Sequence, residues 1–505
     1  MTEPAPERLT SLSSPTDLRS KADGLLALGP RETASSAHVG IVDRIADELA
    51  SLGRQVRRDT HTFDRWSVPD ARCALTVHDA ARGDLAIPVA SAYPYSGRTG
   101  HPGVSAPLQF VRCAARWSGV TGKIAVIEIP HPSVPVRLLL DDVGHLPAGA
   151  GGFPESYRHP VLSAKAFGPN LAAAKAAGAV GVVAVWQGAT AAQVDGQYVP
   201  FDLPYRDIPA VWVAGEHGQQ LLDNARRGSR ATLTLDATLS PASTVDTVWT
   251  VVEGETASES ILVVTHTDGV NAVEENGPLG VLELVRLFAA GPRPKRTLVF
   301  VFLATHLRIP AVTDHGLAMT AWLEAHPEWW SGEGTAVRAV AGLVIEHLGA
   351  LVRARQRPGE LVSSEVELIY ATNAAMEDVV RKSWTGRQRG KALIARPTLI
   401  HLGEGQPLYH KGIPAIALAS VPAYLLETTT LDVVDTDLMN EQIGTFARAL
   451  LMLESMPAHL LGRADQQGLA SKVLTGIPLL LIFVRVRLLA WLSTFRRTGS
   501  QTTQK

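Results

Sequence analysis

The feature that most constrains the fold is a regular alternation of two kinds of segment in the second half of the chain. From about residue 243 onward, apolar runs of strand length are separated by segments with the spacing of helices. The runs occupy residues 261–265, 297–304, 339–345, 366–372 and 415–418, and a closing helix is expected over 437–454. This alternation predicts an α/β domain, in which a sheet is covered by helices on both faces.

The stretch from residue 67 to residue 240 has a different pattern, with short β-type runs and many glycines and prolines. Its expected elements are strands over 123–129, 180–186 and 208–213 and an alanine-rich helix over 170–178. Before it, apolar residues at helical spacing over 37–52 stop at Gly53. We therefore expect a β-rich insertion, residues 67–240, in an α/β domain made of residues 21–66 and 241–465.

The two ends of the chain differ in character. Residues 1–20 are polar and proline-rich, which predicts a disordered arm and no secretory signal. Residues 466–505 form a hydrophobic and basic tail, in which Arg485 and Arg487 separate two apolar runs, 473–484 and 488–495.

A membrane-spanning helix needs about 20 apolar residues, and arginines near its middle are costly. For this tail we therefore expect contact with a membrane surface, with a helix docked on the protein itself as the alternative. The predicted location is the cytoplasm or the periphery of a membrane.

Charge and cysteine content exclude other classes of protein. The chain of 505 residues has a formal net charge of −2 and no basic cluster, so we expect no nucleic-acid partner. Its two cysteines, Cys73 and Cys113, are too few for a disulfide scaffold or a cysteine zinc site. Two free thiols are the expectation, with a single disulfide bond as the alternative.

Histidines and carboxylates follow several of the expected strands. In an open α/β sheet, ligands bind at the carboxyl ends of the strands. Imidazole and carboxylate together form a zinc-type ligand set. The residues at these strand exits are His266 and Asp268 after the first run, His306 after the second, Glu346 and His347 after the third, and Glu274 and Glu275 in the loop after the first.

Four stretches of the chain carry a resemblance to a known family. They are "ILVVTHTD", "EENGPLGVLELVRLFAAGPRPKRTLVFVFLA", "GLVIEHLG" and "GEGQPLYHKGIPAIAL". Together they resemble the zinc-dependent aminopeptidase and glutamate carboxypeptidase family, whose fold is a mixed sheet sandwiched by helices. The insertion, with "KIAVIEI" and "NLAAAKAAGAVGVVAVW", resembles a protease-associated (PA) domain, which elsewhere shapes substrate access or binds partners. The resemblance covers roughly residues 20–460.

The resemblance implies roles for several residues. The family uses two zinc ions bridged by a carboxylate, and a glutamate acts as general base. His266 and Glu346 match ligands of the first metal, and Glu275 matches the bridging aspartate. Asp268 matches the aspartate that orients the first histidine. His347, beside Glu346, is a further candidate ligand.

The chain departs from the family pattern at the second metal. His306 and Leu307 stand where the family has a pair of glutamates, so His306 replaces the general base and Leu307 replaces a ligand. A shifted register would place Thr313 and Asp314 there instead. Glu404 replaces an aspartate of the family's Asp-His pair. The late histidine ligand is missing, and Glu427 is the remaining candidate.

These residues predict a divergent metal-dependent hydrolase that cleaves peptide or amide bonds and binds one zinc ion at most. His306 would serve as the base, because an imidazole titrates near neutral pH. The alternative is a non-catalytic protein of the same fold that acts as a binding or scaffold module, with no metal. The sequence also leaves a homodimer open.

Overall fold

The computed structural model describes nearly all of the α/β domain and the insertion. Its described residues are 12–69, 72–79, 83–112, 117–289, 292–308, 316–353, 361–398, 401–429 and 431–468, with 476–478, 480–481, 484–486 and 488. Cys113, Thr313 and Asp314 lie outside these residues, as does most of the tail.

A nine-stranded mixed sheet forms the centre of the α/β domain. Its strand order is β1-β13-β15-β14-β16-β21-β19-β20-β8. The four strands from β15 to β21 run parallel, and antiparallel strands flank them on both sides. The bounds are β1 Arg57–Ser67, β13 Thr238–Val252, β15 Arg296–Leu303, β14 Thr256–His266, β16 Arg338–Ile345, β21 Ala415–Leu418, β19 Val366–Ala371, β20 Lys391–Arg396 and β8 Asp141–Leu146.

The apolar strands bury side chains on both faces of this sheet, because successive side chains of a strand point in opposite directions. In β14, Ile261 and Val263 pack on one face, and Leu262 and Val264 pack on the other. The first face is covered by α2 (Pro15–Leu26), α3 (Ser36–Ser51), α8 (Gly277–Ala289), α10 (Ala374–Ser383) and α12 (Thr436–Ser455). The second face is covered by α9 (Ala318–Ala325) and α11 (Gly405–His410). The prediction of a mixed sheet sandwiched by helices is confirmed.

The first helix begins inside the segment that the sequence assigns to a disordered arm. Ser14 caps α2 in a capping box with Asp17, a proline occupies the first turn, and Leu18 is buried. The predicted disordered arm, residues 1–20, therefore extends too far, because residues 15–20 belong to α2. A cap and one buried leucine are weak signals in a polar sequence, which explains the difference.

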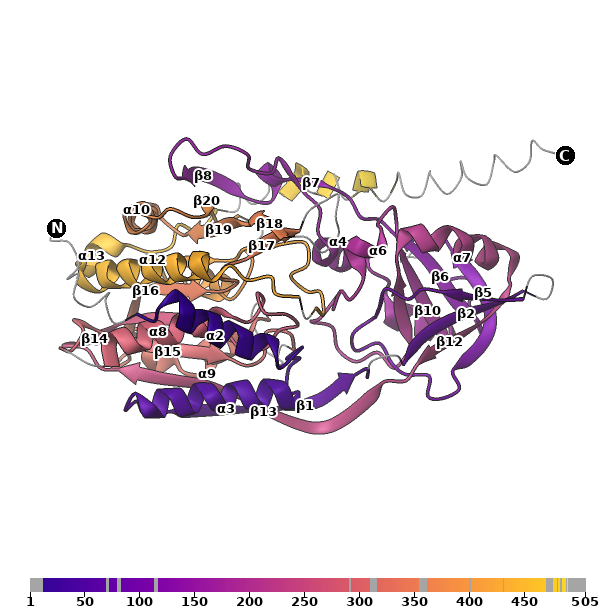
Figure 1. Ribbon diagram of the computed structural model, residues 1–505, viewed down its shortest axis with the longest axis horizontal. Coiled ribbons are helices and arrows are strands. Elements are labelled where there is room, and N and C mark those ends of the chain that lie inside the picture. Colours follow the sequence, from indigo (N-terminus) through magenta and orange to yellow (C-terminus); the bar gives the residue numbers. More distant parts are fainter. Residues whose placement is uncertain are drawn as a thin grey trace.

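A second sheet of eight strands is built entirely from residues within 67–240. Its order is β3-β2-β12-β5-β6-β10-β11-β4. The bounds are β3 Gly83–Ile87, β2 Cys73–Asp79, β12 Arg230–Leu235, β5 Val104–Val111, β6 Ile124–Ile129, β10 Gly181–Trp186, β11 Ala210–Val213 and β4 Ser91–Ala92. One face packs on α7 (Gly215–Arg227), and the other packs on α4 (Pro160–Phe167) and α5 (Leu171–Ala176). Figure 1 shows the two sheets at opposite ends of the long axis.

The insertion is not confined to its own sheet. Strand β8, which lies between β6 and β10 in the sequence, pairs with β20 at the edge of the nine-stranded sheet. The identity of the insertion as a PA domain stays a prediction.

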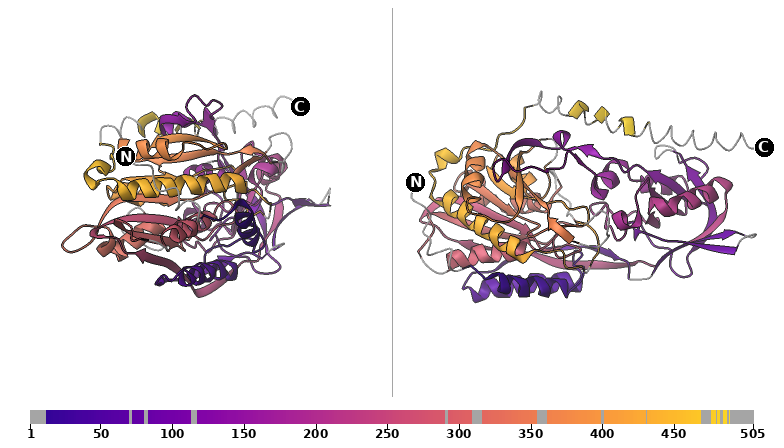
Figure 2. Two further views of the ribbon diagram at one scale, coloured as in Figure 1. Left: turned by 60° about the vertical axis from the view of Figure 1, so that its left-hand side comes forward. Right: turned by 45° about the horizontal axis from the view of Figure 1, so that its top comes forward.

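The insertion also contacts the α/β domain beside the carboxyl ends of the central strands. Tyr198 N donates to Leu426 O (2.7 Å), and Thr428 N donates to Gly196 O (2.9 Å). Buried Val270, Leu307 and Leu426 of the α/β domain belong to the same apolar cluster as the insertion's side chains. The right-hand view of Figure 2 shows the insertion and the α/β domain at opposite ends of the molecule.

Small elements complete the described structure. They are β7 Val134–Pro135, β9 Ser156–Tyr157, β17 Leu351–Arg353, β18 Leu361–Ser364, α6 Ala191–Val194, α13 Ala458–Leu461 and the 3-10 turns Val136–Leu138 and Pro327–Trp329. Among the described residues, no helix is both long enough and apolar enough to span a membrane. Contact between the tail and a membrane surface stays a prediction.

Candidate metal centre

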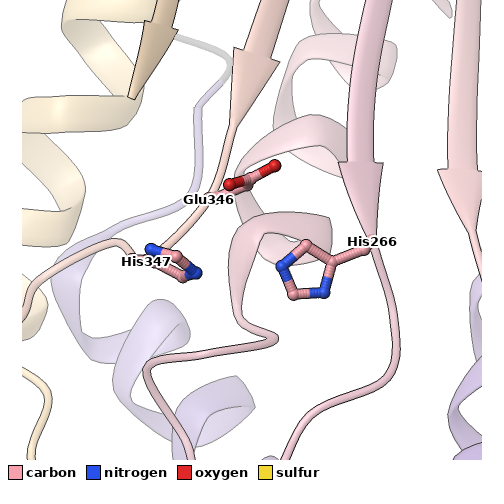
Figure 3. A group of neighbouring side chains, drawn as sticks. All are labelled: His266, Glu346 and His347. Atoms are coloured by element: carbon pink, nitrogen blue, oxygen red, sulfur yellow. The ribbon is translucent and has the colours of Figure 1, made fainter. Parts of the chain in front are cut away.

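The candidate site lies where two central parallel strands end. Strand β14 ends at His266, and β16 ends immediately before Glu346 and His347. The two strands pair in parallel, with Val264 opposite Val344, so their carboxyl ends meet at one edge of the sheet. Figure 3 shows the three side chains gathered at this edge. One ligand-type atom from each lies within 4.8 Å of the other two, and all three residues are buried.

The two histidines of this group are held in the same way. His266 Nδ1 donates to Asp268 O (2.9 Å), and His347 Nδ1 donates to Ser420 O (2.6 Å). Each Nε2 therefore carries a lone pair, and each is buried without a hydrogen-bond partner. A metal-ligating histidine characteristically donates its other ring nitrogen to a carbonyl or carboxylate, which orients the ring. Burial lowers the pKa of both imidazoles, that of His347 to about 3, so both are neutral.

The local backbone is shaped to place these groups. His347 has φ of +56°, a left-handed conformation that a non-glycine residue adopts at a cost of about 1–3 kcal/mol. Gly403 packs against the Glu346 carboxylate, and a Cβ there would lie 2.2 Å from Glu346 Oε2. Glu346 Oε1 accepts from Glu404 N (2.8 Å), whereas Oε2 has no partner. Burial raises the pKa of Glu346 to about 7.

A second group shares His266 and adds Glu274 and His306. The rings of His266 and His306 stack with their centroids 4.1 Å apart. His306 Nδ1 donates to Glu404 Oε1 (2.6 Å), and His306 Nε2 lies 4.0 Å from Glu274 Oε1. Glu274 Oε1 is buried without a hydrogen-bond partner, and burial raises the pKa of this carboxyl well above its usual value.

The charge state of His306 is set by its carboxylate neighbours. Burial lowers its pKa, but the bond to Glu404 and the charges of Glu404, Glu274 and Glu346 outweigh that effect and raise the pKa to about 10. Glu404 is itself fixed, because its Oε2 accepts from Met319 N (2.8 Å). Glu404 thus connects His306 to Glu346 through its own side chain and backbone.

Two of the predicted residues make other contacts. Asp268, predicted to orient His266, contacts it with its backbone carbonyl, which accepts from His266 Nδ1. Its carboxylate binds Thr33 Oγ1 (2.6 Å), His306 N (3.0 Å) and Leu307 N (2.8 Å). Glu275, predicted as the bridging ligand, joins neither group and accepts a hydrogen bond from the buried guanidinium of Arg31. Burial raises the pKa of Glu275 to about 7, against the opposing effect of Arg31.

The structure also places the remaining candidates. Glu427 is paired with Arg353 (2.5 Å), and Leu307 is buried in the apolar cluster next to the insertion. The shifted-register residue Asp314 lies outside the described residues. Sequence reasoning left two participants unassigned, Glu274 and Arg31. Glu274 stood beside a residue that matched the family motif better, and nothing in the sequence around Arg31 indicates a role in the site.

Comparison with solved structures identifies the fold. An aminopeptidase from Aneurinibacillus sp. strain AM-1 is 15% identical, with a TM-score of 0.59, over 88% of this chain and 94% of that one. A zinc aminopeptidase from Bacillus subtilis is 16% identical, with a TM-score of 0.59, over 90% and 98%. A peptidase M28 precursor from Shewanella amazonensis SB2B is 16% identical, with a TM-score of 0.58, over 88% and 98%.

The chain therefore has the fold of zinc aminopeptidases and M28 peptidases. No protein-family model matches its sequence, and a search of curated proteins finds no match. At this low sequence identity the similarity shows the fold alone. The roles of the site residues therefore rest on their own geometry.

Proposed function

We propose that the protein is a metal-dependent hydrolase that cleaves peptide or amide bonds and binds one zinc ion at most. The observation that carries the proposal is the set of unpartnered donor atoms at the strand ends: His266 Nε2, His347 Nε2 and Glu346 Oε2. Two imidazoles and a carboxylate are the protein ligands of many catalytic zinc sites, which keep one position open. The donor set therefore fits zinc.

Residues of this chain would have separate roles beside this ion. Zinc held by such ligands acts as a Lewis acid toward a carbonyl. His306 would accept and return a proton at Nε2, because Glu404 holds its other nitrogen and its side chain keeps 12% exposure. Glu404 is the main cause of the raised pKa of His306, and a cation beside Glu274 and Glu346 would offset the smaller effect of those two carboxylates and so lower that pKa.

One observation favours the alternative, a non-catalytic binding protein. Phe201 of the insertion lies against His306, with ring centroids 5.7 Å apart, and Arg308 Nη1 donates to Leu203 O (2.8 Å). These contacts hold the insertion over the site. These contacts leave less room for a substrate beside His306, which a binding module does not need.

The test is the metal content of protein purified without a chelator, measured by elemental mass spectrometry. We expect about one equivalent of zinc in the wild type and loss of the metal in the double variant His266→Ala, Glu346→Ala. The matched control is Glu216→Ala, His217→Ala, which removes the same residue types from α7, where Glu216 is exposed and His217 is partly exposed and neither belongs to a metal group. A wild-type protein that stays metal-free after zinc is added would contradict the proposal and favour the binding module. Bound zinc would justify a screen of peptide and amide substrates.

A further inference from the structure

Two consecutive glutamates in the loop after β14 are buried equally and bonded differently. Glu274 and Glu275 are both 1% exposed. Glu274 belongs to a group of possible metal ligands with His266 and His306, and its Oε1 has no hydrogen-bond partner. Glu275 belongs to no such group: its Oε1 accepts from Arg31, and its Oε2 has no partner. Both carboxylates converge on Gly269, where a Cβ would lie 2.1 Å from Glu275 Oε2 and 2.5 Å from Glu274 Oε2. Both carboxylates therefore occupy space that a side chain at position 269 would need.

Arg31 is held in place independently of Glu275. It lies between α2 and α3, and its backbone pairs with Gly269: Arg31 N donates to Gly269 O (2.8 Å), and Gly269 N donates to Arg31 O (3.1 Å). Its Nη1 donates to Leu25 O (2.7 Å) and to Gly29 O, and the side chain is 1% exposed. The guanidinium is thus a fixed positive charge beside the loop.

We infer that Arg31 is a positioning residue that holds Glu275 away from the metal, so that Glu274 supplies the loop carboxylate. This inference rests on the proposed function. It extends that function by naming which of the two loop carboxylates acts beside the shared ligand His266.

Two further features disfavour a second ion. Leu307 is a buried apolar residue without donor atoms, and Glu427 is held by Arg353. A guanidinium has no lone pair with which to bind a metal, and it repels a cation placed next to it. A second ion beside Glu275 would therefore meet a positive charge and few donors.

The experiment compares zinc affinity and zinc stoichiometry, measured by competition with a chromophoric chelator and by elemental analysis. The variants are Glu274→Gln, Glu275→Gln, and Glu274→Gln combined with either Arg31→Met or Arg31→Lys. We expect Glu274→Gln to weaken zinc binding by at least about tenfold and Glu275→Gln to change it by less than about threefold.

The combined variants separate a positioning role from a merely structural one. Arg31→Met frees Glu275, so it should restore zinc binding to Glu274→Gln, whereas Arg31→Lys keeps the charge and should not. Loss of zinc in Glu275→Gln with retention in Glu274→Gln would overturn the inference and leave the proposed function intact. Failure of Arg31→Met to restore binding in a folded protein would also overturn it.

Two other outcomes are decisive as well. If Arg31→Met does not fold, the comparison of Glu274→Gln with Glu275→Gln decides alone. A wild-type protein that binds no zinc would overturn the proposed function, and this inference with it.

Discussion

The two sides of the candidate site use the same kinds of residue in opposite ways. The donor side consists of His266, Glu274, Glu346 and His347, and the paired side consists of Arg31, His38, Asp268 and Glu275. All eight residues are at most 4% exposed. Each residue of the donor side has a buried ligand-type atom without a hydrogen-bond partner and belongs to a group of possible metal ligands. On the paired side Arg31 Nε and Glu275 Oε2 also lack a partner, but no residue of that side belongs to such a group. On the paired side, Arg31 holds Glu275, Thr33 and two backbone amides hold Asp268, and Thr267 binds His38.

This difference shows which buried polar groups are there for the fold and which are available to a ligand. A buried polar atom without a partner costs about 1–3 kcal/mol, so a cluster of four such groups is expensive unless an ion binds them. When one partner of a buried ion pair is removed, the other charge stays buried without a partner, which is also costly. Substitutions on the paired side should therefore affect stability, and those on the donor side should affect metal binding.

The largest expected effect comes from the neighbouring glutamates. Glu275→Gln leaves the Arg31 charge buried and unpaired, so we expect the free energy of unfolding to fall by about 3–5 kcal/mol. Glu274→Gln in metal-free protein should change it by less than about 1 kcal/mol, because burial already favours the neutral form of this carboxyl. Urea unfolding of the two variants measures the difference. Equal losses would show that the two sides are not distinct.

His347→Ala should have the next largest effect, on metal binding rather than on the fold. Removal of one of three ligands should weaken zinc binding by about 100-fold, which corresponds to about 2.7 kcal/mol. Chelator competition measures the affinity, and thermal unfolding of the metal-free protein should show little change. The matched control is His401→Ala, another buried histidine, which lies outside both metal groups and should leave zinc affinity unaltered. A similar loss in the control would contradict the assignment.

The smallest expected effect is the pH dependence contributed by His38. Ala34 N donates to its Nδ1 (3.1 Å), so Nε2 donates to Thr267 Oγ1 (2.8 Å), and the ring is neutral. Burial lowers its pKa from 6.5 to about 4. Below pH 6.5 the unfolded chain takes up the proton first, so this stability is present above pH 6.5 and is lost as pH falls toward 4.

Between pH 7 and pH 5, His38 alone should contribute a loss of about 2 kcal/mol. Denaturant unfolding of wild type and His38→Gln at both pH values isolates this contribution, because the other buried histidines are common to both proteins. Identical pH dependence in the two would show that His38 is not held neutral by the fold.

Most of the fold follows from local pattern. The apolar runs at 261–265 and 297–304 became β14 and β15, and the helical pattern over 37–52 became α3. The positions of His266, Glu346 and His347 at strand ends also follow, because parallel strands align their carboxyl ends. The pairing of β8 with β20 in the larger sheet could not be predicted from local pattern, because pairing between distant segments leaves little local signal.

Local pattern was enough to predict the class of fold and the edge of the sheet where ligand-type residues gather, because periodicity and strand direction are local properties of the chain. Only the tertiary structure decided which of these residues face one another. Arg31 is more than 240 positions from Glu275 along the chain, yet it binds that carboxylate, whereas Glu274 lies beside His266 and His306. Hydrogen bonding and charge compensation act between atoms that are close in space, and two adjacent glutamates look alike until their partners are known.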